Sequence, residues 1–207
     1  MKNVLRPVLL LTAALVLLTA CDPGGSSGPI EPYVIGTVVG YTGPRAQVDL
    51  RALNPIPETG FEYYDVGNGI VDGDTIKFTL EPAPVAALFL ATEMNYASSD
   101  PELRISLLTV DLAGGGGWFE LGNTNPRKPS SEFRVGDSVA QLMYADRPGT
   151  LSVPPELRES EGMTGGFTLH KGWNVVKTTV TKIGEGVFEQ RFGNGDLGAL
   201  DWYFTAH

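Results

Sequence analysis

Four oxygen-bearing side chains fall within ten residues of the sequence, and such a group could bind a metal ion. They are Asp65, Asn68, Asp72 and Asp74, with glycine at positions 67, 69 and 73 between them. Hard cations such as calcium prefer several carboxylate and carbonyl oxygens on one tight loop. The segment is therefore a candidate calcium site, and no other cofactor is expected. Its spacing differs from an EF-hand loop, however, and aspartate or asparagine beside glycine is equally typical of ordinary β-turns.

A second candidate for chemistry is Ser138. The triplet Gly136-Asp137-Ser138 resembles the nucleophile motif of GDS-type esterases, which pair their serine with an Asp-x-x-His block. Here phenylalanine, not aspartate, stands three residues before each of the two histidines, His170 and His207. A serine nucleophile needs a base at hydrogen-bond distance, which only an unseen tertiary contact could supply. We therefore expect a non-catalytic protein, with a secreted-side serine hydrolase that uses Ser138 and a histidine as the alternative.

Two tryptophans are candidates for ligand contact. Trp118 follows four glycines, and Trp173 follows Lys171-Gly172. Exposed aromatic rings can bind sugars or peptides, because they offer a flat apolar face with a polar edge. Tryptophan is nevertheless highly buried on average, so we expect both to pack in the core.

The elements that must position these residues are short strands. Apolar residues alternate with polar ones in segments bounded by glycine, proline and asparagine, which is typical of β-structure. The expected strands span residues 33–41, 45–53, 75–80, 85–91, 103–112, 135–144, 167–170, 173–180, 187–192 and 200–205. Asn68-Gly69 and Asn194-Gly195 favour tight hairpin turns. Apolar positions in residues 103–112 change phase, which we interpret as a β-bulge near Leu107.

Many short strands with frequent turns predict an all-β fold, either an antiparallel β-sandwich or a partly closed barrel. The run from Gly36 to Tyr41, Gly-Thr-Val-Val-Gly-Tyr, is followed by Val-Asp-Gly-Asp-Thr-Ile-Lys-Phe at residues 71–78. Together they resemble the start of carboxypeptidase-regulatory-like, transthyretin-type sandwiches of secreted bacterial proteins. The resemblance implies an accessory fold without catalysis. The chain departs from that family by running on for more than a hundred further residues.

The first twenty-one residues have the organisation of an export signal. Lys2 and Arg6 precede an apolar run over residues 8–18, which is long enough for a signal-peptide core and too short to span a bilayer. The following Leu18-Thr19-Ala20-Cys21 resembles the lipobox of bacterial lipoproteins. The resemblance implies a cleaved N-terminal signal helix, lipidation of Cys21 with diacylglycerol, and often an added acyl chain such as palmitate. Cys21 is the only cysteine of the chain, so no thiol remains for a disulfide or a thiolate site.

The expected domain organisation is a signal peptide at residues 1–20, a tether rich in glycine, serine and proline at 21–32, and a β-rich extracytoplasmic domain at 33–207. A subdomain break near residues 113–131 is left open, because glycines and prolines gather there. With 15 basic and 24 acidic residues the net charge is −9, and no basic cluster is present. Nucleic acid is therefore not an expected partner.

These observations predict a membrane-anchored extracytoplasmic lipoprotein, acting as a non-catalytic binding or structural component of the cell envelope. Its expected location is the cell membrane, with the outer membrane as an alternative. The lipid at Cys21 would provide the contact with the membrane. The sequence does not distinguish an envelope protein from a glycan as the further partner.

Overall fold

The computed structural model describes residues 30–56, 60–94, 96–155, 162–184 and 187–207. The all-β prediction is confirmed, since these ranges hold fourteen strands and four short 3-10 helices. The strands are β1 (Tyr33–Val39), β2 (Ala46–Ile56), β3 (Gly60–Asp72), β4 (Thr75–Leu80), β5 (Phe89–Leu90), β6 (Ala97–Ser98), β7 (Arg104–Leu112), β8 (Gly117–Gly122), β9 (Ser138–Ala145), β10 (Gly149–Ser152), β11 (Met163–Leu169), β12 (Gly172–Gly184), β13 (Val187–Asn194) and β14 (Asp201–Ala206). The 3-10 helices are η1 (Val85–Ala87), η2 (Ala91–Met94), η3 (Ser130–Glu132) and η4 (Leu197–Ala199). The expected signal helix and Cys21 lie outside the described residues.

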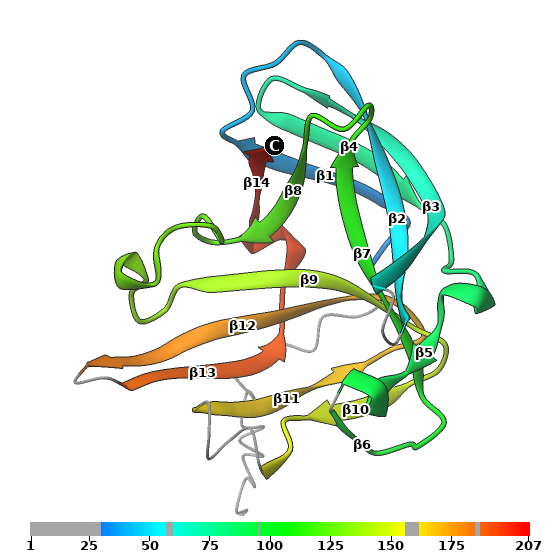
Figure 1. Ribbon diagram of the computed structural model, residues 1–207, viewed down its shortest axis with the longest axis vertical. Coiled ribbons are helices and arrows are strands. Elements are labelled where there is room, and N and C mark those ends of the chain that lie inside the picture. The colour runs from blue at the N-terminus through cyan, green and yellow to red at the C-terminus, as the bar shows by residue number, and fades with distance from the viewer. Residues whose placement is uncertain (1–29, 57–59, 95, 156–161, 185–186) are drawn as a thin grey trace, which may run out of the picture.

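Eight strands close a barrel, which occupies the upper part of Figure 1. Following the hydrogen-bonded pairs, the ring runs β7, β2, β3, β4, β1, β14, β8, β9 and back to β7. All of these pairs are antiparallel except β1 with β14, where Val38 lies opposite Trp202 in parallel register. The barrel alternative of the sequence prediction thus describes the fold, and the further strands lie outside the barrel.

A second sheet extends from the barrel through β9. One edge of β9 contacts the barrel strands β7 and β8, and its other edge pairs with β12. Beyond β12 come β13, β11, β10 and β6, which curve through the lower part of Figure 1. The short strand β5 pairs with the beginning of β7, where Phe89 lies opposite Ile105.

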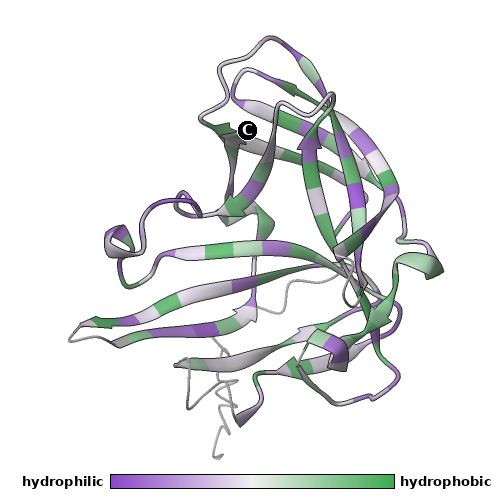
Figure 2. Ribbon diagram, in the orientation of Figure 1, coloured by the Kyte–Doolittle hydropathy of each residue, from purple (hydrophilic) through white to green (hydrophobic). Residues whose placement is uncertain are grey.

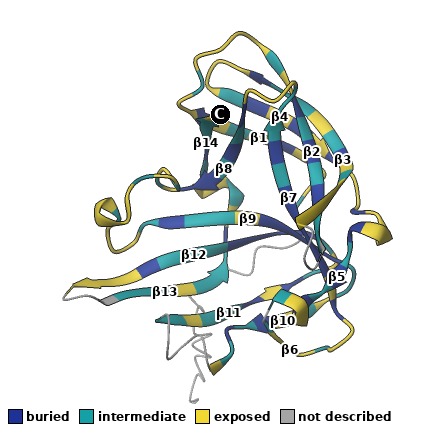
Figure 3. Cartoon of the chain, in the orientation of Figure 1, coloured by how far each residue is buried: buried dark blue, intermediate teal, exposed yellow. Residues whose placement is uncertain are grey.

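Two hydrophobic cores result from this arrangement. The barrel core includes Val34, Leu50, Val71, Ile76, Phe78, Leu108, Val110, Phe119, Leu121, Leu142, Tyr144, Trp173, Val175 and Trp202. The outer core includes Phe89, Leu103, Ile105, Leu107, Met143, Ala145, Leu151, Phe167, Leu169 and Val176. Successive side chains of a strand point to opposite faces, so β9 supplies Leu142 to the barrel core and Met143 to the outer core. Figure 3 shows the resulting run of buried residues at the right-hand end of β9.

The prediction of a β-bulge near Leu107 is wrong. Residues of β7 pair with β2 without a shift, from Val48 opposite Leu112 to Leu53 opposite Leu107. The phase change has another cause: Ile105 and Leu107 face the outer core, whereas Leu108 and Val110 face the barrel core. The first part of β7 therefore buries one face in the outer core, and the second part buries the opposite face in the barrel core.

Residues 60–72 form the long strand β3, which the sequence did not predict. Asn68-Gly69 lies inside this strand, with Gly69 opposite Val48 on one side and Phe78 on the other. The turn between β3 and β4 is at Gly73 instead, which has a φ of 58° that favours glycine. Residues 85–91 also differ from the prediction, because they form two 3-10 segments around the two-residue strand β5.

Residues 113–131 contain β8, which pairs with both β14 and β9. Both cores combine residues from before and after this segment, as shown by Leu50 with Leu142 and by Phe89 with Phe167.

Hydrophobic and hydrophilic residues alternate along many of the strands in Figure 2. In the part of the chain that the structure describes, no helix is long and apolar enough to cross a membrane.

Candidate functional site

A crevice lies where three barrel strands separate. β7 pairs with β8 at Val110 opposite Phe119, and with β9 at Leu107 opposite Met143. β8 and β9 then pair only at their far ends, where Leu121 lies opposite Ala140. The three strands therefore enclose a triangular opening in the barrel wall. A hollow of about 400 Å³ lies there, within the size range of small-ligand pockets.

Most of the residues that line the hollow are apolar, while polar and apolar atoms contribute about equally to its exposed surface. From the barrel strands come Leu108, Val110, Phe119, Leu121, Ala140, Leu142 and Trp202, and from the outer side of β9 and the second sheet come Tyr96, Val139, Met143, Val176 and Phe192, with Pro126 at the loop after β8. The polar lining residues are Glu120, Arg127, Gln141, Lys177 and Thr178. The crevice thus joins the barrel interior to the face of the second sheet, and a few polar groups can orient a ligand there.

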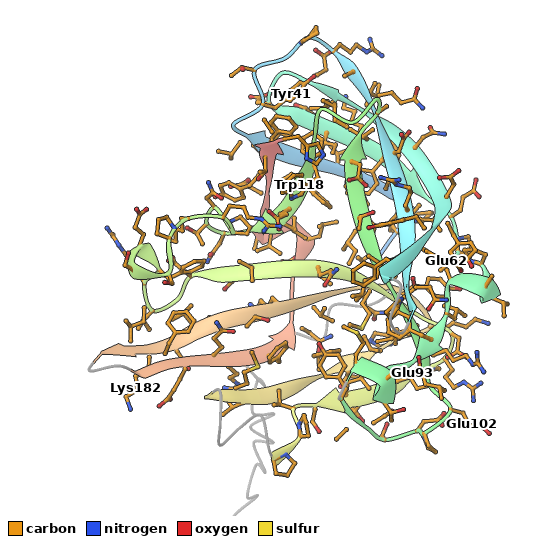
Figure 4. All side chains as sticks on the ribbon, viewed as in Figure 1. Tyr41, Glu62, Glu93, Glu102, Trp118 and Lys182 are labelled. Atoms are coloured by element: carbon orange, nitrogen blue, oxygen red, sulfur yellow. The ribbon has the colours of Figure 1, made fainter. Side chains whose placement is uncertain are left out.

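Two charged side chains of the lining, Glu120 and Arg127, lie next to aromatic rings outside it. The Nε atom of Arg127 donates a hydrogen bond to Glu120 Oε2 at 2.6 Å, and this bond raises the pKa of the guanidinium. The same guanidinium lies over the ring of Trp118, 5.2 Å from the ring centroid. His207 contacts Trp118 as well, with 4.9 Å between ring centroids. Figure 4 labels Trp118 beside β8, above β9.

Trp202 lines the crevice and carries a buried donor. Its side chain is 3 % exposed, and its Nε1 has no hydrogen-bond partner among the described residues. The indole lies against β1 at Gly36, where an added Cβ would be 2.5 Å from both Cδ1 and Nε1. Glycine at this position therefore makes room for the ring, which also contacts Phe78 edge-on at 5.4 Å between centroids. The unpartnered N–H lies at this contact with β1 and has almost no exposed surface.

The four residues of the calcium candidate lie on or beside one extended strand. Asp65, Asn68 and Asp72 belong to β3, and Asp74 follows in the turn to β4. All four are exposed. Asp65 and Asp72 are separated along the strand by roughly 23 Å at the usual rise per residue. Among the described residues, no three histidine, cysteine, aspartate or glutamate side chains are grouped to hold a metal ion.

Ser138 lies at the start of β9 and is 5 % exposed. Its hydroxyl oxygen lies 2.9 Å from the hydroxyl of Thr179, and it donates to the carbonyl of Gly136 at 3.4 Å. Its backbone N–H donates to Asn123 Oδ1 at 2.6 Å. The serine therefore takes part in a local network at the edge of the sheet.

Neither histidine lies beside this serine. His170 precedes Gly172, which pairs with Ala145 at the far end of β9, roughly 23 Å from Ser138 along an extended strand. His207 packs on Trp118, beyond the beginning of β8. The structure thus keeps the three residues of the hydrolase alternative in separate places.

The two tryptophans considered from sequence have different environments. Trp173 is 5 % exposed in the barrel core, and its Nε1 donates to the carbonyl of Glu81 at 2.8 Å. The expectation of core packing is confirmed for this residue. Trp118 instead lies half-buried on the outer side of β8, beneath Arg127. Its ring therefore lies outside both cores and contacts Arg127, which lines the crevice.

Sequence reasoning missed the residues of the crevice, among them Tyr96, Gln141 and Thr178. They come from segments far apart in the chain, and their spacing carries no motif. The available signal was the phase change in residues 103–112, which we interpreted as a β-bulge, whereas it reflects one strand that serves two cores. Comparison with known proteins adds no assignment: no family model, curated protein or solved structure matches the chain.

Proposed function

We propose that this chain is a lipid-anchored, non-catalytic binding protein of the cell envelope, and that its β-domain binds a small ligand in the crevice between β7, β8 and β9. The observation that carries the binding part is the 400 Å³ hollow, whose lining combines apolar side chains with a few polar ones. The rigid strands on all three sides favour a preformed site, since little conformational entropy is lost when a ligand enters it.

The binding proposal can be tested with N-phenyl-1-naphthylamine, an uncharged probe whose emission rises in apolar surroundings. We expect saturable binding to the full chain. In Ala140→Phe, the larger side chain fills part of the crevice from β9 and should weaken binding at least tenfold. Ala86→Phe is the matched control, because Ala86 is exposed and does not line the crevice. Thermal melting followed by circular dichroism checks that both variants fold.

Binding that is equal in both variants would place the probe elsewhere and overturn the proposal. Because Ala140→Phe could strain the barrel, Thr178→Phe provides a second test from the other side of the crevice. Thr178 is half-buried on β12 and lines the hollow. Both filling variants should weaken binding if the crevice is the site.

The anchoring part of the proposal rests on residues 1–21, where a basic start, an apolar core and Leu18-Thr19-Ala20-Cys21 stand in the order of a lipoprotein signal. Two or three acyl chains hold a protein firmly at a membrane, whereas one binds reversibly. We expect wild-type protein in the membrane fraction and Cys21→Ser in the soluble extracytoplasmic fraction. A Cys21→Ser protein that stays with the membrane would show that lipidation is not the anchor.

The serine hydrolase alternative predicts a different outcome. The hydroxyl of Ser138 has partners in Thr179 and Gly136, and the histidines lie away from it, which supports the non-catalytic proposal. A fluorophosphonate probe reacts with activated serines. Labelling of the wild type that is lost in Ser138→Ala would overturn the non-catalytic proposal.

A further inference from the structure

We infer that the ligand of the crevice is a small acidic amphiphile, a molecule with an apolar body and one carboxylate-like or sulfonate-like group. This inference rests on the proposed function, because it names the ligand class of the same site. It goes beyond size and shape, since it follows from which hydrogen-bonding groups line the crevice and which of them are already used.

The apolar body is indicated by the deeper part of the lining. Leu108, Leu121 and Leu142 belong to the barrel core, and Met143 and Val176 belong to the outer core. These side chains are already largely buried, so a ligand gains mainly close packing against them, with about 25 cal/mol for each Å² of apolar surface that is still open to water. A fully polar ligand would gain little from this surface.

The polar part of the lining is rich in donors. The ammonium group of Lys177 lines the crevice and has no ion pair among the described residues. The side chains of Gln141 and Thr178 have no hydrogen bond to any described residue, and each can donate to a ligand or accept from it. Lys177 is thus the group that favours an acceptor on the ligand, because an ammonium can only donate.

The charges of the lining point the same way. Glu120 is its only carboxylate, and this group is already bound to Arg127 at 2.6 Å. Lys177 then leaves one uncompensated positive charge in the crevice. Charge-assisted hydrogen bonds to an anion are about twice as strong as neutral ones. The overall net charge of −9 opposes an anion only weakly, because charges farther than about 8 Å are largely screened at physiological ionic strength.

Two probes with a common body test this inference. The anionic 8-anilinonaphthalene-1-sulfonate has the same phenyl-naphthylamine body as the uncharged N-phenyl-1-naphthylamine and adds one sulfonate. With the full chain at low ionic strength, we expect the anionic probe to bind about tenfold more tightly, the size of one charge-assisted interaction. Both probes should lose affinity in Ala140→Phe.

Lys177→Gln removes the uncompensated charge and should weaken the anionic probe about fivefold or more, with little change for the uncharged probe. The matched control is Lys182→Gln, at the tip of the β12–β13 hairpin, where Figure 4 labels the side chain. Lys182 is exposed, pairs with Glu189 at 3.2 Å and does not line the crevice. This control should leave both affinities unchanged.

The outcomes separate the inference from the proposed function. If the uncharged probe binds in the crevice as tightly as the anionic one, or if Lys177→Gln has no selective effect, the ligand is not acidic and only the inference fails. If the anionic probe binds but ignores Ala140→Phe and Thr178→Phe, it binds at the surface, and the inference fails as well. If neither probe binds, the proposed function itself is overturned.

Discussion

At the scale of single residues, Asn174 shows how one buried amide holds the turn between β11 and β12. It is 1 % exposed, and its Oδ1 accepts the backbone N–H of His170 at 2.9 Å. Its Nδ2 donates to the carbonyls of His170 and Gly172 at 2.8 Å, and to Met143 on β9 at 3.4 Å. The side chain thereby satisfies backbone groups that the turn leaves without strand partners.

We predict that Asn174→Ala lowers the free energy of unfolding by about 2–4 kcal/mol, because buried backbone groups of the turn lose their partners. Urea denaturation followed by circular dichroism measures the change. Asn125→Ala is the control, since Asn125 accepts one exposed hydrogen bond from the N–H of Arg127 at 2.8 Å. A loss as small as that of the control would mean that water replaces the Asn174 contacts.

Asp137 is the residue whose titration matters most for the loop before β9. Its Oδ2 lies 2.6 Å from Lys128 Nζ and accepts the backbone N–H of Arg134 at the same distance. The hydrogen bond from Lys128, followed by the one from Arg134, lowers the pKa of Asp137 below its ordinary value of 3.8. A carboxylate with a lowered pKa stabilises the folded state above its unfolded pKa, and this stabilisation is lost as the pH falls through the folded pKa.

Asp137→Asn should therefore be less stable than the wild type at neutral pH, and the difference should shrink as the pH falls below about 4, the pKa of the unfolded carboxylate, and disappear as the pH falls through the lower pKa of the folded one. Urea midpoints at several pH values measure this. Asp72→Asn, at an exposed carboxylate outside the ion pairs of the described residues, is the matched control for the substitution itself. A constant difference for Asp137→Asn would contradict the assignment.

At the scale of elements, close strand packing explains why β3 was not predicted from the sequence. Gly67 and Gly69 interrupt its apolar pattern, yet both are required by neighbouring backbone. A Cβ at Gly69 would lie 2.5 Å from the Cβ of Phe78 and would also collide with the carbonyl of Lys77. The glycines here are sites of close approach inside a sheet, and not signs of a turn.

Gly69→Ala should cost about 1–3 kcal/mol, the usual penalty for overpacking. Gly193→Ala is the matched control. Gly-Asn-Gly occurs at residues 67–69 and again at 193–195, and Gly193 lies on β13, where an added Cβ meets nothing within 4 Å. That variant should change the free energy of unfolding by no more than about 0.5 kcal/mol in either direction. Chemical denaturation compares them, and equal costs would contradict the close approach at Gly69.

At the scale of the whole molecule, the two cores cannot be separated, because β7, β9 and β12 contribute to both. Leu108 and Val175 belong to the barrel core, while Leu107 and Val176, their neighbours in the chain, belong to the outer core. Melting either core would leave the opposite face of these strands without support. We therefore expect the domain to unfold as one cooperative unit.

Leu50→Ala in the barrel core and Leu169→Ala in the outer core test this expectation, because both side chains are fully buried. Each should lower the free energy of unfolding by about 2–5 kcal/mol and keep a single transition. The transitions followed by near-ultraviolet and far-ultraviolet circular dichroism should coincide. If Leu169→Ala gave two separate transitions, the outer sheet would be an independent unit.

Strand positions could be predicted wherever alternation was regular. The segment 75–80 is β4 as expected, because its apolar positions Ile76, Phe78 and Leu80 all point into the barrel core. The calcium candidate assumed a loop at residues 65–74, and the glycines inside β3 explain why a loop was expected there. Residues of the crevice could not be predicted, since the hollow exists only where three strands that are distant in the chain diverge.

The amino-acid sequence by itself determined that the chain is all-β and where most of its strands run, because side-chain alternation is a local property of each segment. It also predicts the anchor at Cys21, from a motif of adjacent residues that lies outside the described ranges. The tertiary structure alone decided which core each strand face enters, and where the barrel wall opens. Alternation along a strand shows that its two faces differ in polarity, but only the pairing of distant strands determines which residues each face contacts.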